Sequence, residues 1–240
     1  MKIFQGFALA FNMLTIVPFF KVHDYFKGIN GYAAMFYPLV GFLLGLFLWK
    51  VSLLLTPFMP PLHLGVLIFT LWVTLTGALH LDGLSDTIDG LFVQKKRALE
   101  VMKDSHVGGM GMTFTFLFLA LKLSTLLSFE AYALLPIVLM LSRLNATLAI
   151  YMGEYVGGGM GRLAKEELKF WQLALALLYT TLLLFFTHHT ELLLLNVVLL
   201  LVTLKFFSSR LGGMSGDVYG FLIEVSELFL LNALLLEYYR

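Results

Sequence analysis

The chain has 240 residues, of which 60% are hydrophobic and only 13% are charged. Soluble domains average roughly 45–50% apolar and about 25% charged residues, so this composition excludes an ordinary soluble globular domain. The formal net charge of +1 excludes a nucleic-acid binder that works through bulk charge, and the absence of cysteine excludes disulfides, thiolate metal sites and thiol nucleophiles.

Apolar runs of the length that crosses a bilayer, about 20 residues, follow one another along the chain. The first ends near Phe20 and contains Asn12, Thr15 and Pro18, which indicates a mature membrane helix or half-helix and not a signal peptide. Seven further runs lie at about 31–56, 62–80, 112–129, 132–152, 171–187, 192–207 and 219–237. We therefore predict a single all-α, polytopic membrane domain over residues 1–240, a bundle of about seven transmembrane helices plus the N-terminal segment.

Basic residues occupy every second loop between these runs. They are Lys21, Lys27, Lys95, Lys96, Arg97, Lys103, Arg162, Lys165, Lys169, Lys205 and Arg210. The other loops, at 57–62, around Glu130 and at 187–191, contain no lysine or arginine. Because cytoplasmic loops concentrate positive charge, we predict that the basic loops face the cytoplasm. A re-entrant run is the alternative, and it would break this alternation.

The densest polar feature runs from His80 to Gly90, at the cytoplasmic end of the run 62–80. Asp82, Asp86 and Asp89 are spaced i, i+4 and i+7, so on a helix they fall within about 60° of one another. Three like charges repel unless a cation neutralises them, and an all-oxygen carboxylate cluster suits Mg²⁺. We favour a magnesium site over the alternative, a solvated helix end with acidic side chains.

Glycines precede the run that begins near residue 112. Gly108, Gly109 and Gly111 stand where backbone N–H groups at a helix N-terminus approach a phosphate, and Asp104 is placed to add a fourth carboxylate, as ligand or general base. A flexible turn is the usual explanation of paired glycines, and only the neighbouring aspartates favour function here. Two further glycine clusters, 157–161 and 212–216, are expected at the same membrane face.

The last run contains acidic residues on one helical face, with Asp217, Glu224 and Glu227 at i, i+7 and i+10. Glutamates inside an apolar helix are costly unless they face a cavity or a partner. A buried ion pair and a polar cavity floor both remain open for the two glutamates, whereas we favour function for Asp217, which is nearer the loop.

The candidate partners of these glutamates are Arg143 and Lys122, which also lie inside predicted spans. Asn145 follows Arg143 by two residues and cannot share its face on a regular helix, so only one of these two side chains is expected to line the cavity.

Three motifs stand in register with a known family: Thr76 to Leu91, Met102 to Ser105, and Gly212 to Asp217 followed by Glu224 and Glu227. With shorter matches at 15–18 and 37–41, the chain resembles the cobalamin synthase family, adenosylcobinamide-GDP ribazoletransferase, over almost its whole length. The chain departs from the family pattern at Ala78, where a second glycine is frequent, and at Ile16 and His106, where basic residues are found. Ser215 is kept.

The resemblance implies a Mg²⁺-dependent transferase of cobalamin biosynthesis in the bacterial or archaeal cytoplasmic (inner) membrane, with its active site facing the cytoplasm. A ribose hydroxyl of α-ribazole, or of its 5′-phosphate, attacks the cobinamide-linked phosphorus of adenosylcobinamide-GDP, and GMP leaves. The metal ligands would be Asp82, Asp86, Asp89 and Asp104, of which Asp82, Asp86 and Asp104 are also the catalytic candidates. The substrate-binding candidates are His80, Ser105, Gly108, Gly109, Gly111, Arg143, Asn145, Ser215, Asp217, Glu224 and Glu227.

Besides the two substrates, the expected partner is the lipid bilayer and not nucleic acid. A homo-oligomer and an association with other cobalamin-assembly enzymes are left open. The nearest alternative function is a CDP-alcohol phosphotransferase, but Leu84 and Ser85 stand where that family has Ala-Arg after its first Asp-Gly pair. A secondary transporter would use Glu224, Glu227 and Arg143 as an ion relay. The clustering of aspartates at one membrane face, and not at the midplane, argues against it.

Overall fold

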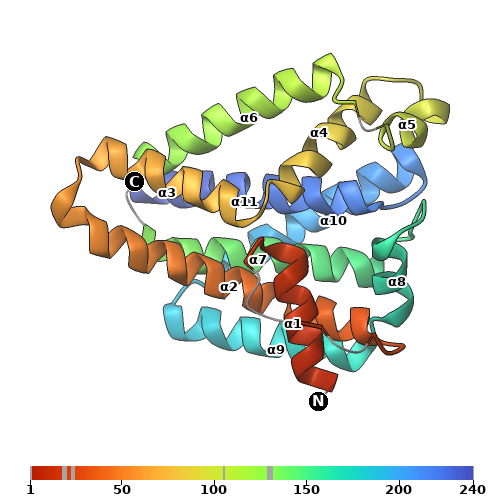
Figure 1. Cartoon of the computed structure of the whole chain (residues 1–240), viewed down its shortest axis with the longest axis horizontal. Coiled ribbons are helices and arrows are strands. Elements are labelled where there is room, and N and C mark those ends of the chain that lie inside the picture. Colours follow the sequence, from red (N-terminus) through yellow and green to blue (C-terminus); the bar gives the residue numbers. More distant parts are fainter. Residues whose placement is uncertain (1, 18–20, 23–24, 105, 129–131, 240) are drawn as a thin grey trace.

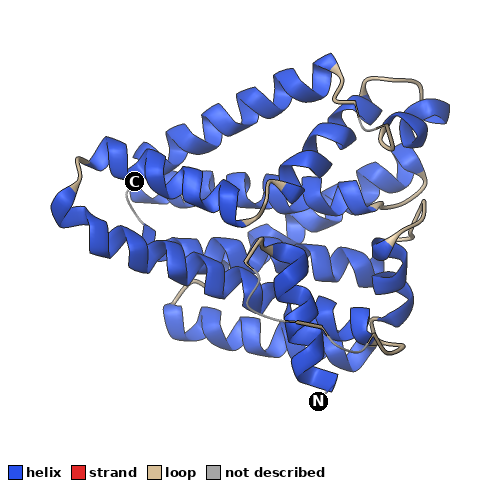
Figure 2. Ribbon diagram, viewed as in Figure 1, coloured by secondary structure: helices blue, strands red, loops and turns tan. Residues whose placement is uncertain are grey.

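The computed structural model describes residues 2–17, 21–22, 25–104, 106–128 and 132–239. Within these ranges the protein is all-α, as predicted, with no extended strand (Figure 2). The helices are α1 (Lys2–Leu14), α2 (Ile29–Leu55), α3 (Pro61–Leu75), α4 (Leu79–Leu91), α5 (Lys95–Val101), α6 (Gly109–Ser128), α7 (Leu135–Met152), α8 (Met160–Glu167), α9 (Phe170–Thr187), α10 (Glu191–Leu211) and α11 (Gly216–Tyr238). Two short 3₁₀ turns, η1 (Thr56–Phe58) and η2 (Tyr132–Leu134), precede α3 and α7.

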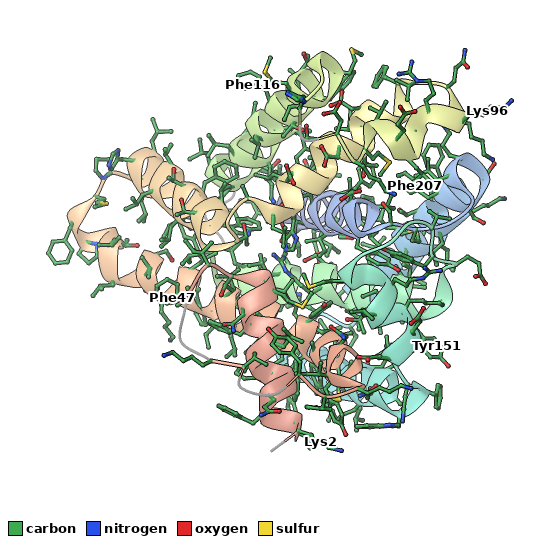
Figure 3. All side chains as sticks on the ribbon, turned by 45° about the vertical axis from the view of Figure 1, so that its right-hand side comes forward. Lys2, Phe47, Lys96, Phe116, Tyr151 and Phe207 are labelled. Atoms are coloured by element: carbon green, nitrogen blue, oxygen red, sulfur yellow. The ribbon has the colours of Figure 1, made fainter. Side chains whose placement is uncertain are left out.

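The described part of the chain contains 6 helices long and apolar enough to cross a membrane, or 7 if α3 and α4 together count as one span. This confirms the predicted polytopic bundle. Phe47 and Phe116, which are 49% and 71% exposed, point outward from α2 and α6 (Figure 3). Because exposed aromatic side chains on apolar helices suit contact with hydrocarbon, the outer surface of these helices is a lipid-facing surface.

The span expected at 62–80 is broken. Helix α3 ends at Leu75, and α4 leaves it at an angle of 81°. The break is made by two consecutive residues in the left-handed region, Gly77 at φ 61° and Ala78 at φ 54°. The aspartates therefore lie on a separate helix and not on the end of a continuous span. The sequence did not predict this bend, because hydrophobic periodicity does not reveal a change of direction made by two backbone angles.

The N-terminal segment was expected to form either a membrane helix or a half-helix, and α1 has the length of a half-helix. Its 13 residues extend over about 20 Å, less than the roughly 30 Å of a hydrocarbon core. It crosses α2 closely (Figure 1), since a Cβ on Gly6 would lie 2.3 Å from Cβ of Tyr32. The helix therefore covers the bundle without spanning the bilayer by itself.

Helix α7 forms the centre of the bundle, and its residues from Leu135 to Ile150 are all buried. It approaches α2 at two glycines: a Cβ on Gly41 would lie 2.2 Å from the carbonyl oxygen of Leu139, and one on Gly45 would lie 2.5 Å from that of Leu135. Small residues at such crossings let helix backbones pack directly against each other.

The loops gather at two opposite ends of the bundle (Figure 1). Helices α5 and α8, which contain lysines and arginines, and the connection between α10 and α11 lie at one end (Figure 1). η1 and the connection between α9 and α10 lie at the other. The described loops thus confirm the predicted alternation of charge. The turn at Glu130 lies outside the described residues.

Candidate active site

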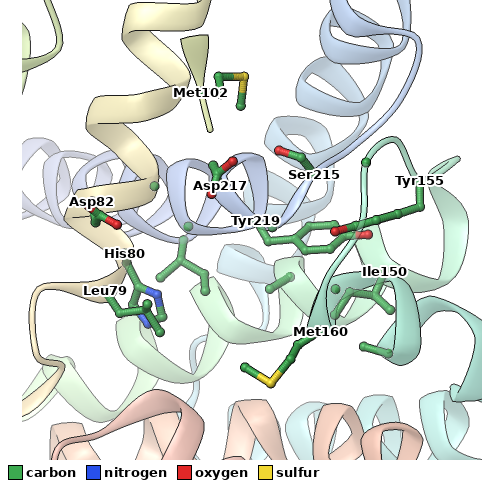
Figure 4. Close-up of a pocket in the computed structure, with 18 of the residues that line it drawn as sticks. Leu79, His80, Asp82, Met102, Ile150, Tyr155, Met160, Ser215, Asp217 and Tyr219 are labelled. Atoms are coloured by element: carbon green, nitrogen blue, oxygen red, sulfur yellow. The ribbon is translucent and has the colours of Figure 1, made fainter. Parts of the chain in front are cut away.

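A pocket of about 460 Å³ is lined in part by residues of α5 and α8, the helices at the end of the bundle that carries the basic loops. It lies between α1, α2, α4, α5, α7, α8 and α11, and most of its lining side chains are apolar. The polar side chains in the lining include His80, Asp82, Lys103, Ser215 and Asp217 (Figure 4). Four of these five were predicted as site residues from the sequence, and Lys103 was not.

Close packing of α4 against α11 brings Asp82 and Asp217 to the same pocket. A Cβ on Gly83 would lie 2.8 Å from the carbonyl oxygen of Asp217, so α4 can approach α11 this closely only at a glycine. The Oγ atom of Ser215 caps α11 by accepting a hydrogen bond from the Val218 N–H at 3.3 Å. Asp217 is therefore held in the first turn of α11, opposite the helix that carries Asp82.

Asp86 lies one helical turn after Asp82, is half-buried, and experiences the charges of Asp82, Asp89 and Asp217. In the described part of the chain, no salt bridge involves Asp82, Asp86 or Asp217. The cluster is a concentration of negative charge without a paired side-chain cation, which favours a bound cation.

The carboxylates of the pocket meet part of what a Mg²⁺ site requires. Among the described residues, no group of three His, Asp or Glu side chains is placed to hold a metal ion. Mg²⁺ is typically bound through one or two carboxylates that share its shell with water and substrate phosphates. Asp82 and Asp217, which both line the pocket, fit such a shared shell in charge and in donor type.

The side chain of Asp89 binds backbone N–H groups at the N-terminus of α6. The carboxylate of Asp89 accepts hydrogen bonds from the N–H groups of Gly108, at 2.8 Å, and Gly111, at 2.7 Å. These are N-terminal groups of α6 that have no partner inside the helix, so a buried carboxylate caps them. Two of the three N–H groups expected to meet a phosphate, those of Gly108 and Gly111, thus meet Asp89. The assignments of Asp89 to a metal and of Gly108, Gly109 and Gly111 to phosphate stay predictions.

Asp104 lies on the surface between α5 and α6, and its side chain is 59% exposed. Its Oδ1 atom is 2.7 Å from Nδ1 of His106, and this hydrogen bond lowers the pKa of Asp104. Asp104 does not line the pocket, although the preceding Lys103 does. Its role as base or ligand stays a prediction, and Ser105 lies outside the described residues.

The two glutamates of α11 have the partners that the sequence suggested. Nζ of Lys122 lies 2.7 Å from Oε2 of Glu224 and also bonds Glu227, which in turn bonds Arg143. All four side chains are at most 5% exposed, and none lines the pocket. The structure thus contains the buried ion-pair network, located behind the pocket wall.

Asn145 also points away from the pocket. Its Nδ2 atom donates to Oδ1 of Asn196 at 2.8 Å and to Oγ of Ser226 at 2.9 Å. Neither Arg143 nor Asn145 lines the cavity, although one of them was expected to, because both are engaged by buried polar groups of other helices. Substrate contacts of Arg143, Asn145, Glu224 and Glu227 stay predictions.

Tyr155 and Tyr219 were missed by sequence reasoning and line the pocket (Figure 4). Their ring centroids are 6.1 Å apart. The segment carrying Tyr155 pairs with the residues before α11, since the Val156 N–H donates to the carbonyl oxygen of Met214 at 2.8 Å. Burial, followed by the charge of Asp217, raises the pKa of Tyr155. In the sequence, the only indication that these two tyrosines belong to the site is that each lies close to a glycine cluster.

Comparisons with known proteins agree over nearly the full length. The family model described as cobalamin-5-phosphate synthase matches residues 6–235. The chain is 36% identical over 245 residues to an adenosylcobinamide-GDP ribazoletransferase of Desulfitobacterium hafniense, with 96% of each chain covered. It is 37% identical over 246 residues to the protein of the same name from Desulforamulus reducens, with 97% of each covered. No solved structure matches the chain.

Proposed function

Because the chain belongs to the cobalamin-5-phosphate synthase family, we propose that it joins adenosylcobinamide-GDP to α-ribazole, or to α-ribazole 5′-phosphate, with release of GMP. The observation that carries this proposal is the match of the chain to relatives named adenosylcobinamide-GDP ribazoletransferase across 96–97% of its length. The pocket with Asp82 and Asp217 in its lining supports it, because carboxylates can hold a cation that neutralises the charge of a diphosphate.

The proposed reaction makes one bond to phosphorus and breaks another. A ribose hydroxyl oxygen bonds to the cobinamide-linked phosphorus, and the bond from this phosphorus to the bridging oxygen breaks, so that GMP leaves with that oxygen. The hydroxyl proton passes to a general base, for which Asp104 stays the predicted residue. Negative charge accumulates on the leaving phosphate, and the site must neutralise it.

The metal proposal follows from this charge. Asp82 and Asp217, which line the pocket from facing helices, would hold Mg²⁺. Asp86, one helical turn after Asp82, stays a predicted ligand and adds negative charge beside them. When bound, Mg²⁺ supplies charge neutralisation at the diphosphate. Lys103 brings a positive side chain to the same lining, and the first turn of α11 presents the positive end of a helix. These residues of the chain would bind and orient the diphosphate.

The proposed location is the cytoplasmic membrane, with the pocket on the cytoplasmic side. The support is the set of lysines and arginines in the loops at the pocket end of the bundle.

The test is product analysis with the protein purified and placed in liposomes. Adenosylcobinamide-GDP, α-ribazole and Mg²⁺ are supplied together and with each omitted in turn, and GMP and the corrinoid product are identified by mass spectrometry. We expect GMP and adenosylcobalamin only when all three are present. Folded protein that releases no GMP would contradict the proposal, as would GMP release that does not require α-ribazole.

A further inference from the structure

The pocket has two chemically different ends (Figure 4). Asp82 and Asp217 lie toward one end, with the apolar side chains of Leu79 and Met102 near them. Ile150 and Met160, without a charged neighbour among the labelled residues, lie at the other end, beyond the tyrosine rings. An elongated ligand that enters this pocket is therefore expected to have a charged part at the carboxylates and an apolar part at Ile150 and Met160.

Tyr155 and Tyr219 form a fixed aromatic wall between these ends. Their rings are inclined at 34°, and Tyr219 is 7% exposed. The Tyr155 hydroxyl donates to the carbonyl oxygen of Gly158 at 2.9 Å, which holds that side chain in place. Rigid aromatic rings beside a methionine and an isoleucine suit a flat aromatic ligand, through offset stacking and sulfur contacts.

The hydroxyl of Tyr219 is an independent indication of a ligand. It is buried, and the described residues provide no hydrogen-bond partner for it. Buried hydroxyl groups are nearly always satisfied, so this one, which belongs to the lining of a pocket, needs an acceptor from outside the protein, and a bound ligand or a water supplies it. Tyr219 therefore offers both a ring to stack against and one directed polar contact.

The volume of the pocket indicates which of the two substrates it can enclose. About 460 Å³ is enough to enclose one small nucleoside, in the usual range for such ligands. The corrin ring of adenosylcobinamide-GDP, with its amide side chains and adenosyl group, is several times larger than this pocket. Only the diphosphate end of that substrate fits beside the carboxylates.

We propose, resting on the transferase function above, that the apolar end of this pocket binds the base of α-ribazole against Tyr155 and Tyr219. The Tyr219 hydroxyl donates to the unsubstituted ring nitrogen of the base. The ribose then points to Asp82 and Asp217, where it meets the diphosphate, and the corrin ring stays outside. Tyr155 and Tyr219 are thus specificity-determining residues for the acceptor nucleoside.

The experiment measures binding of α-ribazole to the purified protein by equilibrium dialysis, and the KM of each substrate. Tyr219→Leu removes the ring, and Tyr219→Phe removes only the hydroxyl. Tyr151→Leu is the matched control, because Tyr151 lies at the end of α7, packs against Phe170 and does not line the pocket. Free 5,6-dimethylbenzimidazole, the base alone, serves as a competitor.

We expect Tyr219→Leu to weaken α-ribazole binding about 10-fold or more, since it loses both stacking and a hydrogen bond. Tyr219→Phe should weaken it about 3- to 10-fold, and the control should change it less than about twofold. The KM for α-ribazole should rise in parallel, while the KM for adenosylcobinamide-GDP stays constant. The free base should displace α-ribazole from the wild type.

Two results would overturn the proposal while leaving the transferase function intact. In the first, the wild type turns over and both Tyr219 variants bind α-ribazole as the wild type does. In the second, the KM rises only for the corrinoid substrate. Binding of α-ribazole that depends on Tyr219 without any GMP release would support the base site and contradict the transferase function. If Tyr219→Leu fails to fold, Tyr219→Phe gives the deciding comparison.

Discussion

Ala78 has the backbone conformation that glycine adopts most easily. It lies at φ 54° in the break between α3 and α4, next to Gly77. The left-handed region costs a residue with a Cβ roughly 1–2 kcal/mol. Ala78, where the family frequently has a glycine, therefore costs folding free energy in this backbone conformation.

We predict that Ala78→Gly stabilises the protein by about 1 kcal/mol through relief of backbone strain. The greater conformational entropy of glycine in the unfolded chain offsets part of this gain. Thermal unfolding in detergent, followed by tryptophan fluorescence, should record a higher Tm. The control is Ala174→Gly inside α9, which should lower the Tm because glycine costs about 1 kcal/mol in a regular helix. A lower Tm for Ala78→Gly would contradict this account of the break.

The polar residues of the site could be predicted from the sequence better than its aromatic ones. Asp82 and Asp217 belong to local clusters whose chemistry is recognisable in isolation, and the partners of Glu224 and Glu227 follow from the cost of unpaired charge in a membrane. Tyr155 and Tyr219 resemble the interface tyrosines found in any membrane protein. They become site residues only through the pairing of Val156 with Met214, a contact between distant segments.

At the scale of the element, the junction of α4 with α6 depends on glycine. A Cβ on Gly111 would lie 2.3 Å from Oδ2 of Asp89 and 2.7 Å from the carbonyl oxygen of Ser85. We predict that Gly111→Ala destabilises the fold by about 1–3 kcal/mol through overpacking and loss of the Asp89 cap.

Gly109→Ala is the matched control for this prediction. It lies at the start of the same helix, with no neighbouring atom within 4 Å of the added Cβ. Denaturant unfolding in mixed micelles compares the two variants. An equal loss of stability in both would show that the junction with Asp89 is not the cause.

Helices α6, α7 and α11 are joined by the buried network of Lys122, Arg143, Glu224 and Glu227. The Nζ atom of Lys122 also lies 4.2 Å from the ring centroid of Trp72 on α3. The sequence identified these residues as candidate partners but not which cation bonds which carboxylate, because that depends on how the helices cross.

We predict that Glu227→Gln destabilises the protein by about 3–5 kcal/mol, because it leaves two buried cations with a single carboxylate. The exposed Glu237 on the same helix provides the control, and Glu237→Gln should change stability by less than about 0.5 kcal/mol. The measurement is the Tm in detergent. Similar Tm values for the two variants would contradict a stabilising role of the network.

At the scale of the whole molecule, the arrangement of basic loops implies an orientation in the membrane. The chain has no cysteine, so single cysteines report on topology without background. Lys96 lies on α5 at the pocket end, and His188 lies at the opposite end of the bundle. Both positions are exposed.

We predict that a membrane-impermeant thiol reagent added outside intact cells labels His188→Cys and spares Lys96→Cys. Lys96→Cys should react once the membrane is permeabilised, which serves as its control. Labelling of both positions from outside would contradict the cytoplasmic placement of the pocket.

The central claim is that carboxylates at this pocket support a metal-dependent transfer to phosphorus. The most direct test is the rate of GMP release from adenosylcobinamide-GDP and α-ribazole as Mg²⁺ is titrated, for the wild type, Asp82→Asn and the exposed control Glu100→Gln on α5. Since charge stabilisation by a bound metal contributes several kcal/mol, Asp82→Asn should lose at least about 100-fold in rate while still binding α-ribazole. The control should follow the wild type. An Asp82→Asn protein with wild-type rate and wild-type Mg²⁺ dependence would contradict the account.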